Sequence, residues 1–113
     1  MNFDRFFQAF AGMEDVAYDT IQNYLSLEPR LINDLTAAAR EGNAKALEIA
    51  AHSLKGTVSN FHAEPCCEAA HALEAIARDG NLTEAHEHVE RLLHELERLR
   101  PELRNLLNQK KAA

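Results

Sequence analysis

The residues of this chain whose types and spacing could do chemistry lie in residues 50–63, AAHSLKGTVSNFHA. This stretch places a histidine, His52, one helical turn before Lys55, and a glycine, Gly56, directly follows the lysine. An exposed imidazole is largely neutral at pH 7 and can then act as a nucleophile. If it accepted a phosphoryl group, a nearby lysine could stabilise the added negative charge through a charge-assisted hydrogen bond. The spacing therefore fits a phosphoryl carrier, and from spacing alone an ordinary exposed histidine fits it equally well.

The direction of His52 follows from the apolar pattern of the helix that carries it. The apolar stripe of this helix consists of Leu47, Ala50, Leu54, Val58 and Phe61. With Leu54 at the centre of the stripe, His52 lies about 200° around the helix axis, because each residue turns the helix by about 100°. We therefore expect the imidazole to point away from the core.

The face that carries His52 is otherwise polar. Its further members are Lys45, Glu48, Lys55, Gly56 and Ser59. A glycine inside a helix lowers the stability of the helix by about 1 kcal/mol relative to alanine. The presence of Gly56 would be explained if a partner that approaches His52 needs the space that a side chain would fill. Ile49, Ala51 and Val58 flank this face and could form an apolar rim for that partner.

The composition and periodicity of the whole chain predict an all-α protein. The 113 residues are enough for one domain, and only four Gly and three Pro interrupt a sequence that is 46% hydrophobic. The last segment has the clearest helical pattern, with leucines and other apolar residues separated by three and four positions. Helices are expected over about 2–10, 13–41, 43–62, 65–79 and 81–108, in a single domain that spans 1–113.

Short connections between these segments predict that successive helices run antiparallel. The expected architecture is an up-down-up-down four-helix bundle with a short extra N-terminal helix. Pro29 should bend the long helix of residues 13–41 near 26–29, or divide it into two helices placed nearly end to end.

Charge and hydropathy exclude several classes of function. A net charge of −6 argues against nonspecific binding to nucleic acid, which needs a basic surface. The chain has no apolar run long enough to span a membrane and no N-terminal pattern of a signal peptide. Cys66 and Cys67 are adjacent and poorly placed to bridge each other, so we expect reduced thiols in the cytoplasm.

The segment around His52 resembles the histidine-containing phosphotransfer (HPt) domains of bacterial two-component phosphorelays. The residues that carry the resemblance are the run His52-Ser53-Leu54-Lys55-Gly56, followed by Asn60-Phe61 and Ala63. The flanking segments REGNAKALEIAAHSLKG and ALEAIARDGNLTEAHEHVERLLHELE are similar to the usual entry into the phosphoacceptor helix and the hairpin after it. The resemblance covers nearly all of the chain after the first ten residues.

This resemblance implies a role for each matching residue. His52 would be the phosphoacceptor, through the ring nitrogen farther from the backbone, Lys55 would steady the phosphoryl oxygens, and Gly56 would leave room for the partner. The docking face would include Lys45, Glu48, Ile49 and Ser59. The partner would be the receiver domain of a response regulator or a hybrid kinase. It would supply an aspartate and Mg²⁺, so this chain would need no cofactor and no metal of its own. His62 departs from the family, which usually has Gly at that position.

Three other readings compete with a phosphocarrier. A histidine-kinase dimerisation domain also presents a histidine, but nothing in this chain resembles the Gly-rich nucleotide-binding domain of such a kinase, so we expect no autokinase activity. A metal-binding bundle would need ligands such as Cys67 and His71; we expect instead inert cysteines, and histidines 86, 88 and 94 on the solvated surface. A non-catalytic adaptor would keep the fold and use the face around His52 only for docking. We expect a monomer, because the bundle satisfies its own apolar seam.

Overall fold

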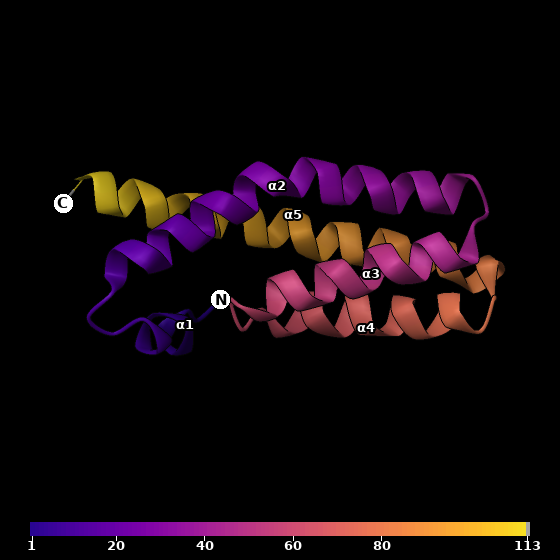
Figure 1. The fold of residues 1–113 in the computed structure, drawn as a ribbon, viewed down its shortest axis with the longest axis horizontal. Coiled ribbons are helices and arrows are strands. Elements are labelled where there is room, and N and C mark those ends of the chain that lie inside the picture. The colour runs from indigo at the N-terminus through magenta and orange to yellow at the C-terminus, as the bar shows by residue number, and fades with distance from the viewer. Residues whose placement is uncertain (113) are drawn as a thin grey trace.

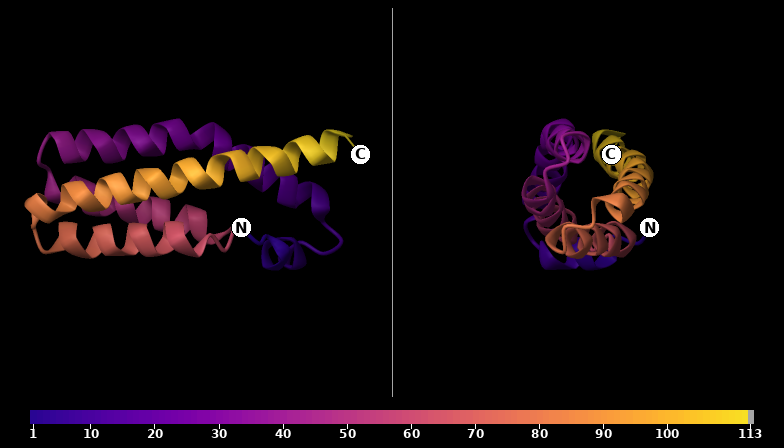
Figure 2. Two further views of the ribbon diagram at one scale, coloured as in Figure 1. Left: turned by 180° about the vertical axis from the view of Figure 1, so that it is seen from behind. Right: turned by 90° about the vertical axis from the view of Figure 1, so that its right-hand side faces the viewer.

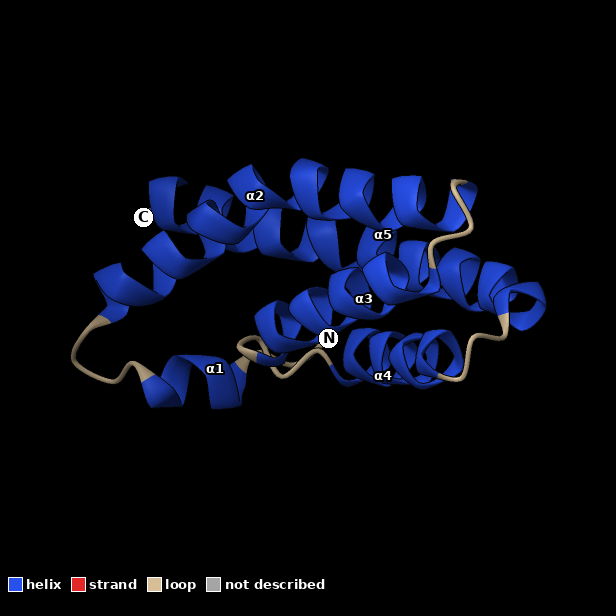
Figure 3. Cartoon of the chain, turned by 45° about the vertical axis from the view of Figure 1, so that its right-hand side comes forward, coloured by secondary structure: helices blue, strands red, loops and turns tan. Residues whose placement is uncertain are grey.

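The structure, a computed structural model, describes residues 1–112, which form helices and no strands. The helices are α1 (Asp4–Ala9), α2 (Glu14–Arg40), α3 (Ala44–Ser59), α4 (Glu64–Arg78) and α5 (Leu82–Ala112). Cartoon and ribbon views show that short turns connect them (Figures 1 and 3).

Helices α2 to α5 form the antiparallel four-helix bundle that the sequence predicts, and α1 is the extra N-terminal helix (Figure 1). Seen along its long axis, the bundle places the four helices around one core (Figure 2). Helices α2 and α5, with 27 and 31 residues, are much longer than α3 and α4, with 16 and 15. Their surplus length extends beyond the bundle on the side where α1 lies (Figure 1).

Two glycine turns at one end of the bundle reverse the chain. Gly42 and Gly80 have φ values of 66° and 76°, in the left-handed region that glycine adopts without strain. The residue after each glycine then caps the next helix: the side chain of Asn43 accepts a hydrogen bond from the Ala46 amide, and that of Asn81 from the Glu84 amide. These local signals explain why α3 and α5 start where they do.

Helix α3 ends at Ser59, earlier than the expected limit at position 62. His62 has φ of 55°, which an α-helix cannot accommodate, so the chain turns before this residue. His62 stands where the resembling family usually has glycine. Its backbone is in the left-handed region, where a glycine would carry less strain.

Aromatic rings close the end of the core beneath α1. Phe6 is fully buried, and its ring centroid lies 5.2 Å from that of Phe61, which follows α3. Phe61 in turn packs edge-on against Tyr24 of α2, at 5.3 Å. These contacts attach the short helix α1 to the bundle.

Helix α2 continues through Pro29 as a single helix and changes direction near its middle (Figure 1). Glu28, the residue before the proline, is buried although it is charged. Its carboxylate accepts hydrogen bonds from the Tyr24 hydroxyl and from Nε of Arg100 on α5. Because a buried carboxylate is stable only when it is paired, this cluster fastens α2 to α5 at the level of the proline.

Replacing Phe6 by alanine should lower the free energy of unfolding by about 3–5 kcal/mol, because it removes a fully buried ring. The measurement is urea denaturation followed by circular dichroism. Phe7→Ala is the control, since Phe7 is only partly buried beside Tyr18 and should cost less. Equal losses for the two variants would show that α1 does not depend on the Phe6–Phe61 contact.

Candidate functional site

His52 lies on the solvent-facing side of α3, with 67% of its side chain exposed. Its neighbours Ala51 and Leu54 are fully buried, so the packing of α3 determines the direction of the imidazole. The helical spacing predicted this direction correctly. Lys55 is also on this side and is 30% exposed.

A buried carboxylate on the neighbouring helix α4 lies beneath these two residues. Glu74 is only 5% exposed. Its Oε2 lies 2.8 Å from Nδ1 of His52, and its Oε1 accepts a hydrogen bond of 2.6 Å from Nζ of Lys55. Glu74 therefore holds both side chains of α3 that the sequence singled out.

The ionisation of Glu74 determines which nitrogen of His52 carries the proton. Hydrogen bonds from Lys55 and then from His52 lower the pKa of the Glu74 carboxyl against the opposing effect of burial, so this group is ionised at neutral pH. An ionised carboxylate can only accept hydrogen bonds, so Nδ1 of a neutral His52 is the protonated nitrogen. The lone pair is then on Nε2, at the far side of the ring, where it is available for reaction.

Arg78 connects Glu74 to a second carboxylate. Its Nη2 lies 3.1 Å from Oε2 of Glu74, and its Nε donates a 2.8 Å hydrogen bond to Glu48 of α3. Glu48 also pairs with Lys45 at 3.4 Å. The hydrogen bond from Arg78 lowers the pKa of Glu48, and the same bond raises the pKa of Arg78. The result is a chain of charges along the α3–α4 seam that ends at His52.

The surface beside His52 is open at Gly56. A Cβ at this position would have no heavy atom within 4 Å, so the packing of this chain does not require glycine there. The Ser59 hydroxyl donates a 2.7 Å hydrogen bond to the Gly56 carbonyl. Gly56 therefore leaves a bare stretch of helix one turn beyond the imidazole.

The predicted docking face is only partly accessible. Lys45 and Ser59 are exposed, Glu48 is half-buried by its ion pairs, and Ile49 is 56% exposed. The predicted apolar rim is wrong at Ala51 and Val58, which are fully buried because they belong to the core side of α3.

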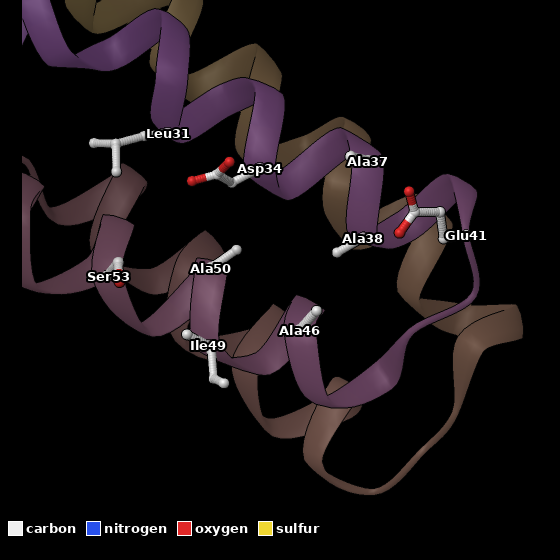
Figure 4. A pocket seen from close by; sticks show the side chains of 9 residues that line it. All are labelled: Leu31, Asp34, Ala37, Ala38, Glu41, Ala46, Ile49, Ala50 and Ser53. Atoms are coloured by element: carbon white, nitrogen blue, oxygen red, sulfur yellow. The ribbon is translucent and has the colours of Figure 1, made fainter.

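Ile49 lies at the edge of a groove between α2 and α3 with a volume of about 360 Å³ (Figure 4). The groove is lined mainly by apolar side chains and by the carboxylates of Asp34 on α2 and Glu41 directly after it. The groove is lined by Ile49, which lies one turn before His52 on α3, so it borders the helix face that carries the imidazole.

The remaining histidines and the cysteines form no second site in the described part of the chain. Residues 1–112 contain no group of three or more His, Cys, Asp or Glu side chains placed to hold a metal ion. Cys66 is buried, and its burial raises the pKa of the thiol to about 12, so it is a poor nucleophile. His86 and His94 are exposed, but the expectation of solvation is wrong for His88, which is half-buried with Nδ1 enclosed and unpaired.

A four-helix bundle with an exposed histidine that is hydrogen-bonded to a buried carboxylate is the arrangement of a helical phosphotransfer module. Comparisons with known proteins support this class. The family model of the Hpt domain matches residues 19–102, well over half of the chain. The chain therefore belongs to the Hpt domain family, whose members are phosphocarriers rather than kinases.

A solved structure supports the same assignment. The crystal structure of histidine-containing phosphotransfer protein B (HptB) from Pseudomonas aeruginosa PAO1 is similar, with a TM-score of 0.87 and 28% sequence identity. The match covers 94% of this chain and 93% of that one. A search of curated proteins by sequence found no match. Family and structure together confirm the function predicted from the sequence, histidine phosphotransfer in a phosphorelay.

In residues 1–112, no helix is both long and apolar enough to cross a membrane.

Glu74 is the residue of this site that sequence reasoning missed. A signal for it was present, because Glu74 is a charged residue inside the apolar stripe of its helix, four residues after Ala70 and three before Ala77. A charge at such a position is buried at a cost unless it meets a partner on another helix.

The lowered pKa of Glu74 predicts how stability depends on pH. The ionised form stabilises the fold above the ordinary glutamate pKa of about 4.5, and this contribution disappears as the pH falls through the lower value of the folded state. Glu74→Gln should therefore flatten the acid side of the curve of unfolding free energy against pH, measured by urea denaturation. Glu68→Gln, exposed on the same helix, should leave the curve unchanged. An acid limb as steep in Glu74→Gln as in the wild type would contradict the assignment.

Proposed function

We propose that His52 is the phosphoacceptor through which this chain relays a phosphoryl group between the aspartates of receiver domains. The observation that carries this proposal is the bond between Nδ1 of exposed His52 and buried Glu74, which leaves the lone pair of Nε2 directed away from the core. A nucleophile, a carboxylate that orients it and an open approach are the parts that such a transfer needs.

In the proposed step, Nε2 of His52 attacks the phosphorus of a receiver's aspartyl phosphate. The new N–P bond forms as the bond from phosphorus to the aspartyl oxygen breaks, and the aspartate leaves as a carboxylate. The ring gains positive charge while Nδ1 keeps its proton, and the carboxylate of Glu74 beside Nδ1 stabilises that charge. Transfer to the next receiver reverses the same bonds.

Lys55 would stabilise the phosphoryl oxygens after transfer. Its Nζ is bonded to Glu74 in the free protein, and the side chain is exposed enough to turn toward Nε2. The phosphoryl group adds roughly two negative charges, which attract an ammonium one helical turn away. The bare surface at Gly56 would admit the receiver's active site to the imidazole.

The partner would dock over His52 and the α2–α3 groove, using Lys45, Glu48, Ile49 and Ser59. The magnesium ion would come with the receiver, so we expect no cofactor bound to this chain alone. We expect a cytoplasmic monomer that binds neither nucleic acid nor membrane and has no autokinase activity. The charge of −6 supports the exclusion of nucleic acid.

Incubation with a small-molecule phosphoramidate should add one acid-labile phosphate to the wild-type protein and none to His52→Gln, as measured by intact mass before and after acid treatment. The matched control is His71→Gln, which removes an exposed histidine from α4 and should be phosphorylated as the wild type is. A phosphorylated receiver domain with Mg²⁺ should give the same pattern. Absence of phosphate on the wild type with both donors would favour the non-catalytic adaptor.

Replacing Ile49 by glutamate should weaken receiver docking without affecting the chemistry of His52. Placing a charge where an exposed apolar side chain meets a partner costs more than about 1 kcal/mol, so we expect about tenfold weaker binding of the receiver by titration calorimetry. Phosphorylation by phosphoramidate should be unchanged. Val16→Glu, a similarly exposed position at the α1 end of α2, should bind as the wild type does. Equal binding by both variants would exclude the groove as the docking surface.

A further inference from the structure

The free protein uses Lys55 for a task that conflicts with its proposed role. Glu74 is buried, and a buried carboxylate without a cation is strongly destabilising. Lys55 Nζ supplies that cation at 2.6 Å from Oε1. If Lys55 turns to the phosphoryl oxygens, this oxygen of Glu74 loses its partner at the moment when further negative charge arrives on His52.

Arg78 is the cation that can stay. Its Nη2 lies 3.1 Å from Oε2 of Glu74, the same oxygen that meets Nδ1 of His52. An arginine remains charged at any pH of interest, and its planar fork can hold two acceptors in fixed directions. The second acceptor here is Glu48, bonded to Nε at 2.8 Å.

The placement of Arg78 on the chain suits this task. Arg78 lies one turn after Glu74 on α4, whereas Glu48 lies one turn before His52 on α3. The guanidinium therefore spans the seam between the helix of the nucleophile and the helix of the orienting carboxylate. Since 59% of the side chain is exposed, the ion pair by itself contributes little to stability. Its effect would be on the charge and direction of Glu74.

We propose that Arg78 is a positioning residue for phosphotransfer: it keeps the Glu74 carboxylate ionised and aligned on Nδ1 of His52 while Lys55 is engaged with the phosphoryl group. This inference rests on the roles proposed above for His52 and Lys55. It adds a residue that touches neither the phosphoryl group nor the imidazole and acts only through Glu74.

The test is a double-mutant cycle in which Lys55→Met imitates the departure of the lysine. The proteins are the wild type, Lys55→Met, Arg78→Ala and the double variant. Each is titrated by NMR, with the Glu74 carboxyl carbon reporting its ionisation and the ring nitrogens of His52 reporting the tautomer. The matched control is Arg98→Ala, which removes an arginine of similar exposure that pairs with Glu95 three residues away on α5.

We expect each single replacement to leave Glu74 ionised at neutral pH, because one cation remains. The double variant should raise the pKa of Glu74 by more than the sum of the two single shifts, by about one unit or more, a tenfold change in the acid dissociation constant. Its His52 should also lose the preference for the Nδ1–H tautomer. Arg78→Lys should restore part of both effects in the Lys55→Met background, and Arg98→Ala should have none.

A double variant whose Glu74 titrates as it does in Lys55→Met would overturn the proposal, because Arg78 would then contribute nothing when the lysine is absent. Phosphorylation by phosphoramidate separates this failure from failure of the proposed function. Wild-type protein that gains no phosphate contradicts the role of His52. Wild-type protein that is phosphorylated, together with additive shifts in the cycle, contradicts the role of Arg78 alone.

Discussion

The buried carboxylate of Glu74 is the constraint on which the site depends. It enters the seam between α3 and α4 with almost no access to water, where ionisation is stable only with several donors. Those donors are Lys55, Arg78 and the imidazole of His52. The need to satisfy one carboxylate therefore orients Lys55, Arg78 and the imidazole of His52 together, and with them the tautomer of the proposed phosphoacceptor.

The bundle supplies the rigidity that this arrangement needs. Helix α3 buries one full face, including Leu47, Leu54 and Val58, so its rotation about its own axis is determined by the core. The opposite face is free for a partner, and the groove toward α2 adds apolar surface next to it (Figure 4). A reactive side chain on a packed helix is positioned more accurately than one on a loop.

A second buried carboxylate, Glu28, has different partners from Glu74 and a different effect on the structure. Glu28 is enclosed by Tyr24 of α2 and Arg100 of α5, and these hydrogen bonds join the two helices. Glu74 instead pairs with side chains that reach the surface. The difference lies in exposure: the Glu28 cluster holds helices together, whereas the Glu74 cluster extends from the core to the exposed imidazole of His52.

Apolar periodicity and turn residues in the sequence were sufficient to predict the helices, their antiparallel order and the outward direction of His52, because these follow from local geometry. The motif from His52 to Gly56 also indicated the family. The end of α3 was placed too late, and His88 was wrongly assigned to the surface. The partners of Glu74 and Glu28 could not be predicted, because a contact between helices depends on their relative rotation and axial register. Only the packing of the whole core decides those two quantities, and with them which nitrogen of His52 is free to react.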